Sequence, residues 1–525
     1  MFRLPPVIAI AAGAALITCA AESAHDAVSP AAAARFLQQA SFGPTPALVA
    51  EVQKSGFSKW IDDQIALDAA NWSPIPAPSV DAKGNTSLRP AQDAFFVNAV
   101  NGRDQLRQRV AFALGQIWVV SGVKLKPEAM VPYLRLLQQD AFSTYDKIMY
   151  DVTVSPAMGH YLDMVNNNKP TAGRGANENY ARELLQLFTI GLVQLDSYGR
   201  PVKDADGNLI PTYNQDVIEG FARAFTGWTY APKPGAAGSR FGNPAYWDAP
   251  MVAFENNHDQ TGGKLLLNNY TLPRNQTAEQ DLKDALANVF NHPNVGPFIC
   301  RQLIQRLVSS NPSDAYVHRI AAVFDSKPRG DMTAVVKAIL LDPEARAGDE
   351  IGAWNQSTKL REPALWITAL MRALNAQVAP SNALTEGASK LGQTIYFPAT
   401  VFNYFLPGYE INISDTTTYN APEFQLLGEA SAMAAADFVN TVAFGKPGGV
   451  TIDYGPYVSM LPVRPGAADI SKMVDALNEA MLGGRMTPAM HDTIVAAAQR
   501  ATTPKAMVQT AVYLIGSSWN FQVER

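Results

Sequence analysis

Apolar residues recur at intervals of three and four positions through most of this chain, and each such stretch predicts an amphipathic helix. Runs with two-residue alternation, which would predict strands, are few and short. We therefore expect an all-α fold with only a minor β element. The predicted helices span residues 31–39, 46–54, 58–67, 92–120, 127–139, 145–152, 177–191, 213–228, 277–290, 293–308, 313–324, 332–341, 363–374, 422–440, 470–481, 487–500 and 504–515.

The middle of the chain departs from this pattern. Residues 195–211 contain two turn-forming runs, at 196–199 and 204–207, and these predict a small β-hairpin. The second run resembles part of a calcium loop but lacks its closing Glu, so no calcium site is predicted there. Residues 229–267 are rich in Pro, Gly, Asn and aromatic side chains, which indicates a long irregular segment of the kind that often carries function.

The first 24 residues have the features of a secretory signal peptide. Arg3 supplies a positive start, residues 7–20 form an apolar run, and small residues follow up to Ala24. The apolar run is shorter than the roughly 20 residues that span a bilayer, so an uncleaved anchor is the less favoured reading. We expect an exported protein, periplasmic or extracellular. The run ending at Cys19 also resembles a lipoprotein cleavage site, although Thr18 departs from the usual small residue, and lipid anchoring at Cys19 is the alternative.

After the signal peptide, the pattern suggests two helical regions. Residues 25–345 form an N-terminal region that includes the hairpin and irregular insert at about 195–267, and residues 346–525 form a C-terminal region that could pack with the first as one unit. No segment after the signal peptide is long and apolar enough to span a membrane. Cys300 would then be the sole cysteine of the mature chain, and its apolar surroundings in sequence predict buried packing.

Composition narrows the class of protein. Hydrophobic residues make up 47% and charged residues 17% of the chain, which is typical of a globular protein with a substantial core. The formal net charge is -5, and no run of Lys and Arg is present. Because binding to nucleic acid requires clustered cations, we expect no nucleic-acid partner.

The densest polar segment opens the predicted helix 177–191. Asn177, Glu178, Asn179, Arg182 and Glu183 lie within its first two turns, and the spacings from Glu178 to Arg182 and from Asn179 to Glu183 permit contact. One interpretation is an ordinary capped helix with paired charges. The other is a pair of carboxylates held by an arginine beside a helix N-terminus, where anions are favoured.

The helix after the hairpin repeats this theme. Asp216, Glu219 and Arg223 fall on one stripe, and Gly220 on that stripe permits close approach of another segment. These charges could simply decorate a solvated helix. Trp228, which leads into the irregular segment, could form a stacking platform for a sugar or cover the core.

A third polar group lies in the irregular segment. His258 next to Asp259, in a loop that continues to Lys264, is a plausible acid/base or ligand pair. Metal binding by His258, Asp259 and a glutamate is an alternative, although the six histidines show no metal-site spacing. His160, His292, His318 and His491 read as isolated helix-end or surface residues. The pattern identifies no cofactor.

Several of these blocks together resemble a known family. They include the runs at 155–169, 177–191 and 213–228, His258-Asp259 with Lys264, and the runs at 391–393, 401–404 and 421–423. The resemblance is to the bacterial domain-of-unknown-function 1800 family and covers about residue 34 to the C-terminus. It implies an exported protein of unassigned activity, with a possible partner encoded by a neighbouring gene for a second uncharacterised exported protein.

From the residues we expect three polar groups to converge in one cleft. Glu178 or Glu183 would act as acid or base, and His258 would be oriented by Asp259. Arg182 and Lys264 would bind an anionic or polyhydroxylated group. We expect a hydrolase or lyase that acts on an envelope or extracellular polymer; the alternatives are a non-catalytic envelope scaffold or partner-binding protein, and a metal-binding protein. The expected substrate-binding residues are Asn177, Asn179, Arg182, Asp216, Glu219, Arg223, Trp228 and Lys264.

Overall fold

The computed structural model of the protein describes residues 28–236, 238–352, 358–414 and 417–524. The predicted mostly helical fold is confirmed, since 52% of the chain is helical and the described strands form only two-stranded sheets. The predicted signal peptide and Cys19 lie outside the described residues. No helix in the described ranges is both long and apolar enough to cross a membrane.

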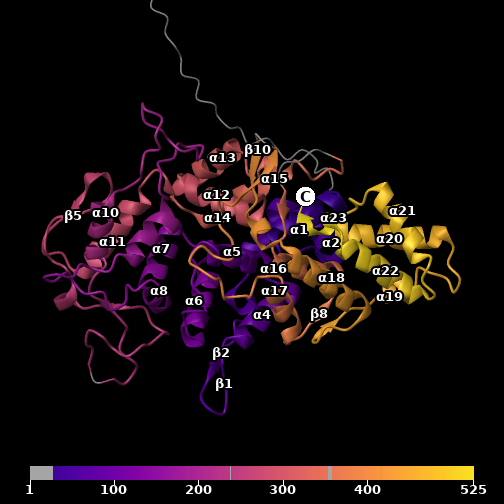
Figure 1. Cartoon of the computed structure of the whole chain (residues 1–525), viewed down its shortest axis with the longest axis horizontal. Coiled ribbons are helices and arrows are strands. Elements are labelled where there is room, and N and C mark those ends of the chain that lie inside the picture. The colour runs from indigo at the N-terminus through magenta and orange to yellow at the C-terminus, as the bar shows by residue number, and fades with distance from the viewer. Residues whose placement is uncertain (1–27, 237, 353–357, 415–416, 525) are drawn as a thin grey trace, which may run out of the picture.

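The N-terminal part of the chain folds into a series of short helices (Figure 1). They are α1 (Pro30–Ala40), α2 (Pro46–Ser55), α3 (Phe57–Ile65), α4 (Arg89–Asn101), α5 (Gln105–Gly115), α6 (Pro127–Gln139), α7 (Tyr145–Val154), α8 (Pro156–Tyr161), α9 (Asn179–Glu183), α10 (Gln215–Ala224), α11 (Ala278–Phe290), α12 (Val295–Leu307), α13 (Asp314–Phe324), α14 (Met332–Leu341) and α15 (Pro343–Arg346).

The C-terminal part adds a second group of helices, which extends away from α10 and α11 toward the opposite end of the molecule (Figure 1). They are α16 (Pro363–Ala373), α17 (Asn382–Lys390), α18 (Glu429–Phe444), α19 (Gly455–Val458), α20 (Ala467–Leu482), α21 (Pro488–Ala498), α22 (Pro504–Gly516) and α23 (Trp519–Gln522). Tighter or wider helical turns occur at η1 (Ala69–Asn71), η2 (Asp140–Phe142), η3 (Leu184–Thr189), η4 (Glu255–Asn257), η5 (Leu267–Asn269) and η6 (Pro422–Leu426).

Within the described ranges, the strands form antiparallel pairs and no larger sheet. The pairs are β1 (Ser79–Val80) with β2 (Thr86–Ser87), β3 (Trp228–Thr229) with β4 (Val252–Ala253), β5 (Lys264–Leu265) with β6 (Thr271–Leu272), β7 (Lys359–Leu360) with β12 (Val523–Glu524), β8 (Gln377–Val378) with β11 (Val450–Thr451), and β9 (Glu410–Ser414) with β10 (Thr417–Asn420). The predicted hairpin at 195–211 is present as single bridges, Leu195 to Pro201 and Lys203 to Leu209, around two tight turns.

Side-chain caps explain several helix starts that the sequence predicts. Ser29 Oγ accepts from Ala32 N at 3.1 Å before the proline that opens α1. Thr277 Oγ1 accepts from Gln280 N at 3.2 Å at the start of α11. These oxygens satisfy backbone N–H groups that have no partner inside the helix, so a hydroxyl residue before the apolar pattern fixes the first turn.

Two predicted helices are interrupted. The stretch 92–120 divides into α4 and α5 because Gly102 adopts an extended conformation with ψ of 149°. The helix predicted over 422–440 was wrong in its first third: η6 ends at Leu426, Gly428 is extended with φ of -142°, and only then does α18 begin. Both glycines have extended backbone angles that any residue can adopt, so what glycine contributes at each break is its low helix propensity.

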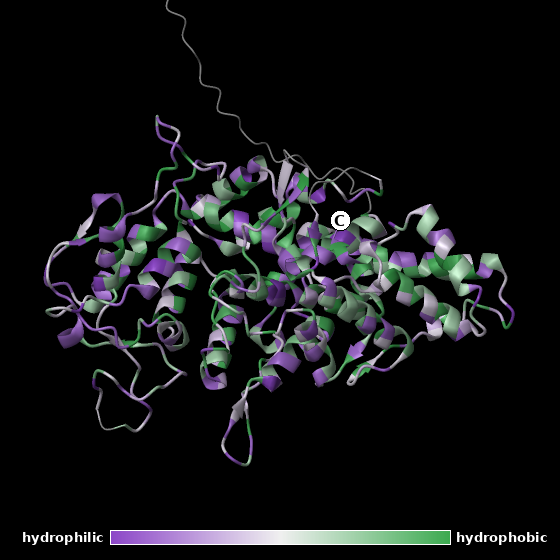
Figure 2. Ribbon diagram, in the orientation of Figure 1, coloured by the Kyte–Doolittle hydropathy of each residue, from purple (hydrophilic) through white to green (hydrophobic). Residues whose placement is uncertain are grey.

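Two groups of buried apolar side chains form the interior. The larger joins the helices from α1 to α15, and it contains Phe36, Trp118 and Phe188, each 0% exposed. The second joins α16 to α23 and also includes Phe95 and Phe96 of α4. Most helices carry both hydrophobic and hydrophilic residues along their length (Figure 2), as amphipathic packing around such interiors requires. The proposed boundary at residue 345 stays a prediction.

Helix α10 occupies the position that organises the candidate site. It packs against α9, α11 and β5. Gly220 explains the close contact with β5, because a Cβ atom at this position would lie 1.8 Å from the backbone oxygen of Leu265. The glycine on this stripe therefore serves close backbone approach, as the sequence suggested.

Candidate functional site

The densest polar segment forms a short α-helix that ends in a wide turn. Helix α9 covers Asn179–Glu183, and the chain continues as a π-helical turn over Leu184–Thr189. Thr189 Oγ1 donates to the Leu184 carbonyl at 2.5 Å and is fully buried. A regular helix would have placed Thr189 on the polar face, and the wide turn moves it inward. Such turns are frequent at functional sites.

Glu178 and Arg182 form an ion pair, as their spacing predicts, and a third residue from α10 completes the group. Arg182 Nη2 lies 2.8 Å from Glu178 Oε2. Gln215 Nε2 donates to both oxygens of Glu178 at 3.0 Å. The side chains of Arg182 and Glu178 are 41% and 31% exposed, so this cluster faces solvent while it joins α9 to α10.

Glu183 has a different environment on the same helix. It is half-buried, and its Oε2 has no hydrogen-bond partner among the described residues although solvent does not reach it. Burial raises the pKa of Glu183, and the charge of Arg182 opposes that effect. A carboxyl group with a raised pKa and an unused oxygen is the type of group that enzymes use to transfer protons near neutral pH.

Tyr213 lies close enough to Glu183 for the carboxyl group to affect the pKa of its hydroxyl. Its hydroxyl is also buried and has no partner among the described residues. Burial raises the pKa of Tyr213 to about 12, with Arg182 lowering it and Glu183 raising it. Since both Arg182 and Glu183 act on this hydroxyl, the three side chains lie in one neighbourhood between α9 and the start of α10.

Asn179 connects this neighbourhood to a further charged pair. Its Nδ2 donates to Asp163 Oδ2 at 3.1 Å, and the other oxygen of Asp163 pairs with Lys124 Nζ at 2.9 Å. The backbone of Asn177 is anchored in the same way, because Asn167 Oδ1 accepts from Asn177 N at 2.8 Å. The polar residues around the start of α9 are therefore held by side chains of the preceding loop.

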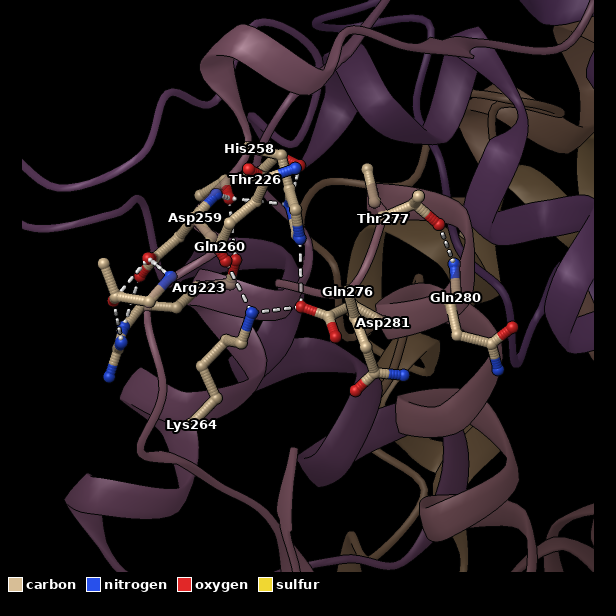
Figure 3. Close-up of polar contacts among 12 residues, drawn as sticks. Arg223, Thr226, His258, Asp259, Gln260, Lys264, Gln276, Thr277, Gln280 and Asp281 are labelled. Carbon is tan, nitrogen blue, oxygen red and sulfur yellow. Dashed lines mark hydrogen bonds and ion pairs between the residues drawn. The ribbon is translucent and has the colours of Figure 1, made fainter. Parts of the chain in front are cut away.

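His258, Lys264 and Asp281 form a polar cluster (Figure 3), and their side chains are sealed from solvent. His258 Nε2 lies 2.9 Å from Asp281 Oδ2, and Lys264 Nζ pairs with the same oxygen. The other ring nitrogen, Nδ1, lies 2.9 Å from the backbone oxygen of Thr226. All three side chains, His258, Lys264 and Asp281, are 0% exposed. With both ring nitrogens engaged, the imidazole has no nitrogen left for a substrate or a metal.

Asp259 does not orient His258; Asp281 of α11 occupies that role. Asp259 instead accepts from Arg223 Nε at 2.6 Å (Figure 3) and from Thr261 Oγ1 at 2.6 Å. Burial raises the pKa of Asp259, but the hydrogen bonds from Thr261 and Arg223 lower it by more, and the result is below the ordinary value. Asp259 therefore fastens the loop to the end of α10.

The three expected groups are thus linked through α10, and the His258 side chain of the third group is closed to solvent. Gln215 meets Glu178 at the start of this helix, and Arg223 meets Asp259 near its end. Eight residues of helix correspond to about 12 Å. Asp216 and Glu219 are exposed between the two ends, whereas Trp228 is 3% exposed and covers the core.

Sequence reasoning missed three residues of these clusters. Tyr213 and Gln215 belong to a polar run that was recognised, but neither residue type alone indicates a site. Asp281 sits in α11, 23 positions after His258, where it reads as an ordinary first-turn carboxylate. Only the tertiary contact identifies it.

The described residues contain no group of three or more His, Cys, Asp and Glu side chains that could hold a metal ion. Cys300 is fully buried, and burial raises the pKa of its thiol well above the ordinary range, as inert packing predicts.

Comparison with known proteins gives a family but no activity. No curated protein and no solved structure matches this chain. One family model, described as "Protein of unknown function (DUF1800)", matches residues 35–523, which is nearly the whole chain. The blocks that carry the polar clusters all fall inside that range, and the chain belongs to the DUF1800 family.

Proposed function

We propose that this protein is an exported enzyme of the hydrolase or lyase type, which acts on an envelope or extracellular polymer with Glu183 as its general acid or base. The observation that carries the proposal is that two oxygens, Glu183 Oε2 and the Tyr213 hydroxyl, are each buried without a partner among the described residues, and that the charges of Arg182 and Glu183 both act on Tyr213. Buried polar groups are nearly always hydrogen-bonded, so two such groups together favour a role that a substrate completes.

The environments of the two glutamates assign them different roles. Glu183 has the raised pKa that lets a carboxyl keep its proton and donate it to a leaving oxygen. In a hydrolytic step, a water molecule would then add to the substrate, and its released proton would return to the Glu183 carboxylate. Glu178 is engaged by Arg182 and Gln215, so it positions the guanidinium, which would bind an anionic or hydroxylated group of the substrate.

In this proposal the His258 cluster is structural. Lys264, Asp281 and His258 brace the loop between α10 and α11, and the loop in turn fixes the end of α10 through Arg223. The start of α10 then holds Gln215 against Glu178. The brace therefore supports the geometry of the site from a distance and makes no contact with substrate.

The test is the substitution Glu183→Gln, which keeps the shape of the side chain and removes the transferable proton. We expect the wild-type protein to depolymerise at least one substrate in a panel of envelope and extracellular polysaccharides, and we expect the variant to lose activity by about 100-fold or more. Glu51→Gln, at an exposed glutamate of α2, is the matched control and should stay fully active.

Thermal unfolding of both variants would show that the fold is retained. Full activity of Glu183→Gln would remove Glu183 from the mechanism. Absence of turnover by the wild-type protein across the whole panel would contradict the enzymatic proposal.

The sealed His258 cluster favours a second candidate, a non-catalytic envelope scaffold that binds a partner protein. Buried ion pairs of this kind act as struts that are costly to break. Under this alternative, affinity capture from envelope fractions would recover one stoichiometric partner, such as the product of a neighbouring gene, and no polymer would be degraded. Detection of the protein in the cytoplasmic fraction after cell fractionation would contradict export under both proposals.

A further inference from the structure

A broad groove opens beside the candidate site, on the far side of Lys124. Its empty space is about 1420 Å³, including the part open to solvent. The walls come from the segment before α6, from the end of α8 and from the irregular segment between β3 and β4. The lining residues are Lys124, Lys126, Glu128, His160, Lys233, Pro234, Ala245, Tyr246, Trp247 and Asp248.

An aromatic cluster forms one wall of this groove. The Trp247 ring meets His160 edge to face at 5.6 Å and Tyr230 at 5.2 Å. His160 Nδ1 lies 2.9 Å from the Tyr230 hydroxyl, so the two rings behind Trp247 are fixed relative to each other. The indole remains partly exposed in the groove and offers a rigid apolar surface.

Charged groups surround this aromatic surface. Lys124 pairs with Asp163, but Lys126 and Lys233 are exposed and have no ion-pair partner within the described residues. Glu128 Oε2 is buried without a partner in the same ranges, and Asp248 is exposed at the rim. Burial lowers the pKa of His160, Lys124 and Lys126 lower it further, and Asp163 opposes them. The lowered pKa favours the neutral imidazole, whose Nδ1 lies 2.9 Å from the Tyr230 hydroxyl.

A chain of side-chain contacts links the groove to the neighbourhood of Glu183. Lys124 lines the groove and binds Asp163, and Asp163 accepts from Asn179. Asn179 and Glu183 are four residues apart on α9, which places them about 6 Å apart on one helix face. A chain lying in the groove could therefore extend to Glu183 with a bond near its carboxyl group.

We propose that this groove is the binding site for an acidic saccharide chain. The sugar ring packs on Trp247, hydroxyl groups donate to Glu128, and carboxylate groups of the chain meet Lys126 and Lys233. The lining contains no arginine, which is the side chain best suited to bidentate recognition of phosphate. The groove therefore favours a carboxylate-bearing polysaccharide over a polynucleotide. This inference names the substrate class of the proposed enzyme and rests on that proposed function.

Binding can be measured separately from turnover by titration calorimetry with the full-length mature protein. The probes are oligomers of galacturonate, alginate and hyaluronan, together with methyl-esterified oligogalacturonate and oligothymidylate. We expect at least one acidic oligosaccharide to bind, and we expect the methyl ester, which keeps the sugar ring but lacks the charge, to bind about tenfold more weakly than the free acid if galacturonate is that ligand.

Two variants test the residues of the groove. Lys126→Ala with Lys233→Ala should weaken binding about tenfold by removing two exposed charge contacts, and Trp247→Ala should weaken it about fivefold to tenfold. The matched controls are Lys472→Ala with Lys505→Ala, and Trp519→Ala, which remove exposed lysines and a partly exposed tryptophan of the C-terminal helices. These controls should bind as the wild type does.

The two proposals fail in distinguishable ways. Glu183→Gln should bind the saccharide normally without turning it over. If Glu183→Gln is active while the groove variants bind the saccharide more weakly, the catalytic role of Glu183 is removed and the groove assignment stands. Unchanged binding by both groove variants, preference for oligothymidylate, or no binding of any acidic oligosaccharide at millimolar concentration would overturn the groove assignment.

Discussion

The two ends of α10 hold clusters of similar residues in opposite surroundings. At its start, Glu178 and Arg182 pair with each other, and their side chains are 31% and 41% exposed. Near its end, the brace formed by Lys264, Asp281 and His258 is completely buried. A charge pair in water adds little stability, while a buried pair cannot lose one member without leaving the other unpaired. The Glu178–Arg182 pair is therefore open to a binding partner from solvent, whereas the buried brace is a strut.

The largest effect should come from breaking the buried brace. Asp281→Ala removes the carboxylate that Lys264 and His258 share inside the protein and leaves Lys264 only its hydrogen bond to the Asp259 backbone oxygen, so we expect it to lower the free energy of unfolding by about 3–5 kcal/mol. Urea unfolding followed by circular dichroism measures this change. A loss below about 1 kcal/mol would mean that water reaches the brace, and the contrast between the two ends of α10 would disappear.

The matching substitution at the open end should have a much smaller effect on stability. Glu178→Ala removes one member of the exposed pair, and we expect it to lower the free energy of unfolding by less than about 1 kcal/mol. The same urea titration compares it directly with Asp281→Ala. Equal losses in the two variants would show that Glu178 is as structural as Asp281.

The smallest effect should appear in how stability depends on pH, with opposite signs for two carboxyl groups. Burial raises the pKa of Glu183, so the stability contributed by its proton is complete below the ordinary glutamate pKa and is lost as pH rises through the raised value. Asp259 has a lowered pKa, so its contribution is present above the ordinary aspartate pKa and is lost as pH falls through the lowered value.

Urea unfolding between about pH 3 and pH 8 tests this pair of signs. Glu183→Gln should flatten the part of the curve that declines with rising pH, and Asp259→Asn should flatten the part that declines with falling pH. An effect of the same sign in both test variants would contradict the assigned environments.

Much of the helical framework follows from the sequence, because each helix combines a local start signal with a repeated apolar stripe. Helix α14 was predicted at its observed bounds, and α1 and α11 begin where a hydroxyl cap and the apolar pattern coincide. The helix predicted over 422–440 failed for a physical reason that was visible in the sequence. Gly428 interrupts it, although the alanine-rich composition of the stretch favours a continuous helix.

The candidate site was less predictable than the fold. Glu178 and Arg182 are four residues apart, which is one helical turn, so their contact can be predicted directly from the sequence. The partner of His258 depends on how the loop packs against α11. The sequence favours Asp259 because it is adjacent to His258, but the side chain that contacts the imidazole is Asp281. The groove at Trp247 involves His160 from a distant helix, so no local pattern could indicate it.

The wide turn after α9 has a consequence for how this family could vary. It accommodates a surplus residue between the carboxyl of Glu183 and the apolar side chains that anchor the segment, such as Phe188. Deleting one residue from Leu184–Thr189 would restore a regular helix and preserve the anchoring contacts. It would also rotate everything upstream by about 100°, which carries Glu183 away from Tyr213. The length of this turn, rather than its composition, sets where the carboxyl group points.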